Sequence, residues 1–223
     1  MTEIINSLYN NFGEITQVVL LSLFVSTFST GIASILGCIL GIPVALNNFK
    51  MKKAIMRVAN TLMSLPPVLM GLLVYMTLSR RGPLGEFELL FTPTAMIISQ
   101  TLLVLPIIFG LVVSSVSKNA EDIKKTCISL GAGKYDTFIT VIKESKVHIF
   151  TAITTGFGRA ISEVGAVMMV GGNIRGYTRV MTTYIALETN KGNYNEAIFI
   201  GLVLLSISFL INSILYRFQG REY

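Results

Sequence analysis

Charged residues are scarce in this chain. They make up 13% of its 223 residues, whereas hydrophobic residues make up 52% and the mean hydropathy is +0.67. Soluble domains carry about 25% charged residues, so a solvated globular surface is excluded. The two cysteines are too few for a disulfide scaffold, and the apolar content is too high for a disordered chain. The composition therefore indicates an integral membrane protein, whose net charge of +6 is a topology signal and not a sign of nucleic-acid binding.

Five long apolar stretches divide the sequence. A membrane-spanning helix needs about 20 apolar residues, and these stretches do not alternate as the strands of a membrane barrel do. We therefore expect an all-α membrane protein with a single domain, residues 1–223, and five membrane-spanning helices. The approximate ranges of these helices are 16–47, 58–79, 92–116, 147–171 and 196–216.

The distribution of lysine and arginine predicts the topology. Twelve of them fall on the side that holds the C-terminal tail and the loops after the first and third stretches, against five on the other side. Because cytoplasmic loops carry the excess of basic residues, the first side is expected to be cytoplasmic. The sequence thus predicts a multi-pass protein of the cell membrane, with its N-terminus outside and its C-terminus in the cytoplasm.

Pro66 and Pro67 lie inside the second apolar stretch. Proline removes a backbone donor and clashes with the preceding turn, so the pair is expected to break the helix. Carbonyl groups freed at membrane depth must be satisfied by protein or water, not by lipid. We therefore expect this break to line a central cavity.

The longest cytoplasmic segment, residues 118–146, has the composition of an ordered element. Ala120–Leu130 and Lys134–Ser145 are expected to form two short helices around a glycine turn. An apolar stripe with a basic rim suits a cytoplasmic protein partner. It equally suits a hairpin that lies on the acidic inner leaflet.

Residues for catalysis or cofactor binding are lacking. Gly131–Lys134 is not a phosphate loop, because Ile128 stands where the first glycine is needed and Tyr135 follows the lysine. His148 is the single histidine and has no second ligand at metal-binding spacing. We expect no enzymatic activity, no metal and no cofactor, so any ATP hydrolysis would belong to a separate subunit.

The cytoplasmic segment resembles the coupling loop of ABC-importer permeases, whose pattern is Glu-Ala-Ala, three residues, Gly, and later Ile-x-Leu-Pro. Gly131 is kept, whereas Lys125 replaces the glutamate and Val141–Glu144 replaces the final four residues. In that family the loop docks on an ATP-binding subunit. The residues that the resemblance places in the coupling loop are Lys125, Thr126, Cys127, Leu130, Gly131 and Ala132.

Two further segments resemble oxyanion permeases. Leu65–Glu86 (LPPVLMGLLVYMTLSRRGPLGE) is similar to a span of molybdate permeases, and Phe157–Arg179 (FGRAISEVGAVMMVGGNIRGYTR) is closest to tungstate permeases. The resemblance implies a homodimeric permease of an ATP-driven importer, with tungstate as the first candidate and molybdate or sulfate as the alternatives. It also implies an extracytoplasmic oxyanion-binding protein as a partner. A self-contained secondary transporter or channel is the rival class, but it would need internal repeats or an intramembrane ion relay.

Arg159 and Glu163 are the charged residues inside the fourth stretch, and they stand four residues apart. A charge at membrane depth is costly, so it normally faces the interior of a bundle or water. The two residues can form a structural pair that fixes helix packing. Alternatively, Arg159 attracts a dianion and Glu163 weakens its binding, with Ser162 beside them on the pathway.

Overall fold

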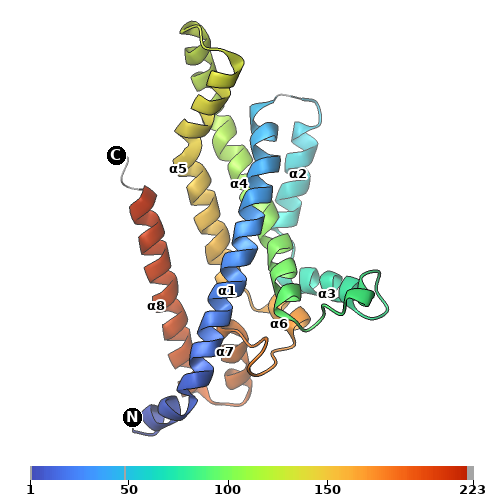
Figure 1. Cartoon of the computed structure of the whole chain (residues 1–223), viewed down its shortest axis with the longest axis vertical. Helices are drawn as coiled ribbons and strands as arrows, with labels where there is room; N and C mark the ends of the chain where they lie inside the picture. The colour runs from blue at the N-terminus through green and yellow to red at the C-terminus, as the bar shows by residue number, and fades with distance from the viewer. Residues whose placement is uncertain (1, 48, 220–223) are drawn as a thin grey trace.

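Three long helices form the centre of the molecule. The computed structural model describes residues 2–47 and 49–219, and the described residues are helices and turns without a strand. The long helices are α1 (Thr2–Leu46), α4 (Pro93–Ser129) and α5 (Lys134–Ile161). In Figure 1 they run side by side along the molecule, α4 packing against both of the others. The expected all-α class is confirmed.

Small residues let α1 and α4 approach closely. A Cβ atom added at Gly37 would lie 2.9 Å from Cγ2 of Ile108, so a larger residue would push the helices apart. Ile108 and Val112 are completely buried in the core beside it. Such close contact replaces the hydrophobic driving force that helices lack in lipid.

Hydrogen bonds also tie the three long helices together. Ser29 of α1 donates from Oγ to Oε1 of Gln100 on α4 over 3.0 Å. Gln100 in turn donates from Nε2 to the carbonyl oxygen of Ala160 on α5 over 2.8 Å. Both side chains are buried, so this pairing satisfies polar groups that water cannot reach.

The second expected span, 58–79, is a bent pair of helices. α2 (Lys52–Met63) ends before the proline pair, and α3 (Pro67–Leu78) begins at its second member. The two helices meet at an angle of 96°, and Figure 1 shows α3 turned away from the long helices toward the short 3₁₀ helix η1 (Gly85–Phe87). Pro67 suits the first turn of α3, where no backbone donor is required.

The fourth expected span, 147–171, is divided in a different way. Its first part is the end of α5, which ends at Ile161, and its last part is the separate short helix α6 (Gly165–Gly171). α7 (Met181–Asn190) and α8 (Tyr194–Gln219) follow. The expectation of one continuous helix here was wrong. It assumed that a run of apolar residues forms a single helix regardless of the contacts that neighbouring segments of the chain make with it.

The expected short helices of segment 118–146 are not separate elements either. α4 continues through Lys118 to Ser129, and α5 begins at Lys134, well before the fourth apolar stretch. Charged residues mark where a helix leaves lipid, but the backbone hydrogen bonds of the helix continue past them. The segment is therefore the tip of one long hairpin.

Three described helical stretches are long and apolar enough to span a membrane: Gly13–Leu46, Pro93–Lys118 and Tyr194–Leu215. The bent pair α2–α3 would make a fourth, so the count of five stays a prediction. Almost none of the apolar stretch of α8 is buried within the chain. That surface suits lipid or another subunit.

Candidate functional site

A polar stripe runs along the exposed side of α5. Its members are spaced three or four residues apart, which places them on one helix face. All are exposed except Arg159, whose side chain is 37% exposed. The stripe consists of His148, Thr151, Thr155, Arg159 and Ser162.

The hydroxyl groups of this stripe bond to their own helix. Thr155 donates from Oγ1 to the carbonyl oxygen of Thr151, and Ser162 donates from Oγ to that of Gly158, each over 2.9 Å. Because these hydroxyl groups donate to the backbone, they offer a polar surface but no fixed set of hydrogen-bond donors to an anion. Such a face suits water more than lipid. This stripe was not predicted from the sequence, although the spacing of its members alone reveals it.

Arg159 and Glu163 form the expected ion pair. Arg159 Nη1 lies 3.1 Å from Oε2 of Glu163, and the Glu163 side chain is only 2% exposed. The two residues do not share one helix, however, since α5 has ended before Glu163. The pair therefore spans the break between α5 and α6.

Glu163 also holds the elements around that break. Its Oε1 accepts a hydrogen bond from the backbone N–H of Ala166 in the first turn of α6, over 3.1 Å. Its carbonyl oxygen accepts a bond from Oγ1 of Thr182 on α7, over 2.7 Å. One buried residue thus joins α5, α6 and α7, a role that depends on Thr182 and could not be found from local spacing.

Small residues bring α6 against α3. A Cβ atom added at Gly71 would lie 2.7 Å from the Cα atom of Ala166, and one added at Gly165 would lie 2.6 Å from Cγ2 of Val68. Gly158, in contrast, has nothing within 4 Å of such an atom. The small residues around the break therefore make a tight contact on α6 and an open surface on α5.

The tip of the α4–α5 hairpin turns at Gly131. This glycine has a φ of +76°, which side-chain-bearing residues rarely adopt. The N–H of Gly131 donates to the carbonyl oxygen of Ile128, and that of Ala132 donates to the carbonyl oxygen of Cys127. This pair of bonds is a Schellman motif, which ends α4 and explains why the coupling-loop resemblance keeps the glycine.

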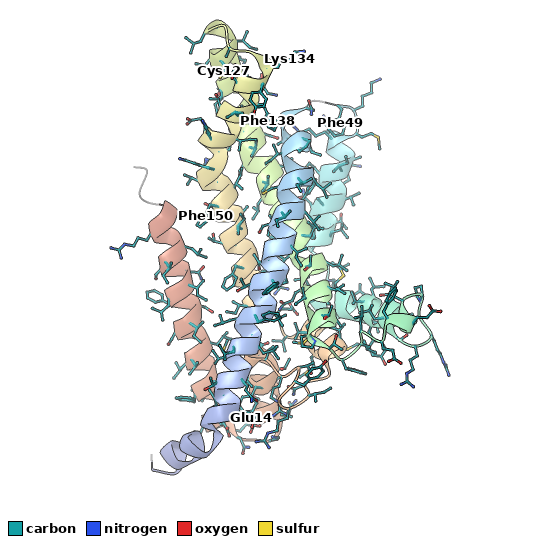
Figure 2. All side chains as sticks on the ribbon, in the orientation of Figure 1. Glu14, Phe49, Cys127, Lys134, Phe138 and Phe150 are labelled. Atoms are coloured by element: carbon teal, nitrogen blue, oxygen red, sulfur yellow. The ribbon has the colours of Figure 1, made fainter. Side chains whose placement is uncertain are left out.

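The tip exposes large apolar side chains. Leu130 is 81% exposed and Tyr135 is 75% exposed, whereas Cys127 is buried. Lys125 is exposed and pairs with Glu121 over 3.3 Å, and Thr126 bonds back to Asp122. Figure 2 shows Cys127, Lys134 and Phe138 together at this end of the molecule.

Two lysines connect the base of this tip to the end of α1. Lys124 of α4 donates from Nζ to the carbonyl oxygen of Leu46. Lys52 of α2 donates to the carbonyl oxygen of Ala45 over 2.9 Å and to Ser117 of α4 over 3.2 Å. Cations at the negative end of a helix dipole are favourable, so these contacts fix α1 against the hairpin.

A charged cluster lies at the opposite end of the molecule, where Figure 2 labels Glu14. The Glu14 carboxylate pairs with Arg175 and with Arg179, each over 2.6 Å. Tyr184 donates to Oε1 of Glu196 over 2.6 Å, and burial together with this bond to a carboxylate raises the pKa of Tyr184. The arginine pairs join α1 to the segment before α7, and the bond from Tyr184 joins α7 to α8.

Helices that span a membrane, a polar stripe at their side and an exposed apolar hairpin tip define a membrane permease subunit. Residues 33–221 match the family described as "Binding-protein-dependent transport system inner membrane component". The chain belongs to this family, and it is a multi-pass inner-membrane protein.

Curated relatives and a solved structure agree with this assignment. The chain is 48% identical to the tungstate uptake system permease protein TupB of Peptoclostridium acidaminophilum, covering 92% of this chain and 90% of the relative. It is 38% identical to a probable anion ABC transporter permease protein of Haloferax volcanii, covering 95% of this chain and 93% of the relative. The crystal structure of an amino acid ABC transporter with histidines has the same fold, with a TM-score of 0.67 and 14% identity. The match covers 96% of this chain and 97% of the solved chain.

Proposed function

We propose that this chain is the translocation subunit of an ATP-driven importer of a tetrahedral oxyanion, and that the anion is tungstate. The polar stripe on α5, which contains Arg159, is the observation that carries the proposal. A bare dianion cannot cross hydrocarbon, so its path must offer water, dipoles or positive charge. The likeness to tungstate and anion permeases supports the choice of substrate.

Two copies are needed to enclose this path. On one chain the stripe is open to its surroundings, where lipid contact with Arg159 would be costly. A second copy related by a two-fold axis would face the first stripe with its own and leave a polar channel between them. Glu163 brings the net charge of each Arg159–Glu163 pair close to zero, so the anion binds weakly enough to leave.

The ATP-binding subunit docks at the hairpin tip. Exposed Leu130 and Tyr135 supply the apolar anchors, and the turn at Gly131 fixes their direction. The binding protein docks at the opposite end, where Arg175 is exposed beside Glu14. With these two docking sides the N-terminus would be outside and the C-terminus in the cytoplasm, and the excess of basic residues supports this orientation.

Uptake into proteoliposomes tests the pathway. Vesicles would contain the permease, its ATPase and the binding protein, and ATP-dependent uptake of tungstate, molybdate and sulfate would be measured per assembled complex. Thr155→Leu places an apolar side chain in the middle of the stripe and should lower tungstate uptake severalfold. Ser206→Leu is the matched control, because Ser206 is an exposed hydroxyl residue on α8. Equal uptake by the two variants would contradict the pathway.

A double variant tests the role of Arg159 without removing the cap of α6. Arg159→Met with Glu163→Gln removes both charges but keeps a side-chain oxygen that can accept from the N–H of Ala166. We expect the complex to assemble and to lose most of its uptake. Normal uptake would mean that the pair is structural.

Docking is tested at the hairpin tip. Leu130→Ser should weaken binding of the ATPase subunit, measured by co-purification, because it removes an exposed apolar anchor without changing the turn. Gly131→Asn is the control, since asparagine tolerates the left-handed conformation. If Leu130→Ser binds the ATPase as wild type does, the tip is not the docking site.

A further inference from the structure

α2 carries a polar face of its own, separate from the stripe on α5. Ala59 is buried and Met63 is half-buried against α4, so these residues mark the side of α2 that packs inward. A second side is exposed and polar, with its members three or four residues apart. This α2 polar face consists of Lys53, Arg57, Asn60 and Ser64. The third side, with Val58 and Leu62, is exposed and apolar, so polar and apolar surfaces are separated on this helix.

The α2 polar face reaches well into the membrane-spanning region. At the start of α2, Lys52 donates to Ser117, beside the end of the apolar stretch Pro93–Lys118 of α4. At the end of α2, Sδ of Met63 lies 3.0 Å from a Cβ atom added at Gly110. Gly110 is eight residues inside the end of that stretch, or about 12 Å along the helix. A polar face against lipid is costly at this depth, so water or a polar partner must cover it.

One side of α4 is left open between α2 and α5. Gly110 packs against α2, Ile108 packs against α5, and Val112 packs against α1. Successive helix residues are rotated by about 100°, which places the exposed Ser114 about 40° from Gly110 and about 160° from Val112. Ile108 lies on the other side of Ser114, at about 120°. Ser114 therefore projects away from α1, on the open side that α2 and α5 flank.

The polar faces of α2 and α5 are both turned toward this open side. Leu62 of α2 and Leu40 of α1 line one apolar cavity, so that side of α2 is turned toward α1. Asn60 is rotated by about 160° from Leu62 and points away from α1. On α5, Figure 2 shows Phe150 on the side of α8, which contacts α1. Arg159 is rotated by about 180° from Phe150 and points away from α8, so both polar faces border the open side.

Lys53 and Arg57 give the open side an excess of positive charge at the end nearer the hairpin tip. Both are exposed, and neither pairs with a carboxylate in the described part of the chain. The segment 49–63 contains no acidic residue. Arg159, in contrast, pairs with Glu163 over 3.1 Å. The positive potential is therefore higher beside Lys53 and Arg57 than beside Arg159.

We propose that the α2 polar face is the second wall of the anion path, and that Lys53 and Arg57 draw the oxyanion from the Arg159–Glu163 pair toward the cytoplasmic exit. This inference rests on the proposed function, because it assigns the release half of the same path. Two copies about a two-fold axis would enclose the path with four polar walls, two from α2 and two from α5. Cations that are exposed to water attract a dianion without holding it tightly, so the anion can leave.

The alternative is that these cations only orient the chain in the membrane, as basic residues at the cytoplasmic surface do. That role requires their charge, but it does not require a water-filled surface at Asn60 and Ser64. The two readings therefore differ in what covers the deeper half of the α2 polar face.

Cysteine accessibility tests the face. Single cysteines would be introduced in a Cys38→Ala, Cys127→Ala background, and the complex with the ATPase would be reconstituted in lipid nanodiscs. Reaction rates would be measured with two water-soluble methanethiosulfonates, the anionic sulfonatoethyl and the cationic trimethylammonioethyl reagents. Asn60→Cys and Ser64→Cys should react severalfold faster than Leu62→Cys, the matched control on the apolar side of the same helix.

The two reagents also measure the potential. The ratio of the anionic to the cationic rate at Asn60→Cys rises with the positive potential there. Arg57→Gln should lower this ratio severalfold and should lower tungstate uptake by the complex in proteoliposomes. Lys50→Gln is the control, because it removes the same charge from the turn before α2, outside the polar face. It should change the ratio and the uptake much less.

Equal rates at Asn60→Cys and Leu62→Cys would overturn the inference, since lipid or protein would then cover the face. A ratio that Arg57→Gln leaves unchanged, or normal uptake by that variant, would overturn it as well. Failure of the proposed function has a different signature. If the wild-type complex takes up no tungstate, that function is refuted, while fast reaction at Asn60→Cys would still support a water-filled wall on α2.

Discussion

Two helices of this protein are broken at membrane depth, and the two breaks are made by different chemistry. Between α2 and α3 the break is caused by the backbone, because Pro66 and Pro67 prevent a continuous helix. No side chain caps the start of α3. Between α5 and α6 no proline is present, and the break depends on Glu163, which binds Arg159 and the N–H of Ala166. The first break is built into the chain, whereas the second is maintained by contacts that can be exchanged.

This difference indicates which break can move. A proline bend keeps its geometry when its surroundings change, because its cause lies in the backbone itself. A break held by one ion pair and two hydrogen bonds can rearrange when any partner shifts. The second break also adjoins the polar stripe, so we expect conformational change during transport to occur at Glu163 and not at the proline pair.

Glu163→Ala should have the largest effect on stability. It leaves Arg159 without its partner and the N–H of Ala166 without an acceptor, and removing one member of a buried pair costs about 3 kcal/mol. Denaturant unfolding of the purified permease would measure the loss. Glu163→Gln keeps an acceptor and should lose less. If Glu163→Ala unfolds at the wild-type midpoint, the second break does not depend on this residue.

Gly71→Ala should have the next largest effect. The new methyl group would meet the backbone of Ala166, and overpacking of this kind costs about 2 kcal/mol. Gly158→Ala is the matched control, because its methyl group meets nothing and a helical glycine gains about 1 kcal/mol on this change. The two variants should therefore shift the unfolding midpoint in opposite directions. Shifts in the same direction would contradict the tight contact between α3 and α6.

Pro66→Ala should have a small effect. Pro67 still disfavours a helical conformation at the preceding residue, so the bend should persist with a loss of about 0.5 kcal/mol. Spin labels at Val58 and Leu73, both exposed, would report the distance across the bend. We expect that distance to match the wild type. A longer distance, as in a straightened helix, would show that the first break is no more robust than the second.

The smallest effect is expected at Glu188. Like Glu163 it is a buried carboxylate, but it lies on α7, outside the membrane-spanning helices. Burial raises the pKa of Glu188, but hydrogen bonds from Lys191 and Asn193 outweigh it and lower the pKa below the ordinary value of 4.5. Its contribution to stability is therefore present above pH 4.5 and is lost as the pH falls through the lowered pKa. Thermal unfolding of wild type should show this decline, and Glu188→Gln should lack it. Parallel curves would contradict the prediction.

The two breaks also differ in how far the sequence predicts them. The proline pair is visible in the sequence, and α3 begins at its second residue, because the cause is local. The end of α5 is not visible, since it depends on Thr182 from an element that follows 19 residues later. Similarly, Gly131 predicts a turn, but the length of the helices on either side was underestimated. Lysines at the membrane surface were taken as helix ends, although the backbone bonds of α4 and α5 continue past them.

The continuity of α5 has a mechanical consequence. Its 28 residues form one rod about 42 Å long, with the proposed docking tip at one end and Arg159 in its last turn at the other. The helix has no proline and no break along this length, so it acts as a stiff lever with no compliant joint between the two ends. A force applied at the tip reaches the arginine as a rotation of the same rigid body. A movement of the ATPase at the tip and the displacement of Arg159 at the anion path would then be parts of one rotation. The ratio of the two displacements would be fixed by the point at which α5 pivots against α4.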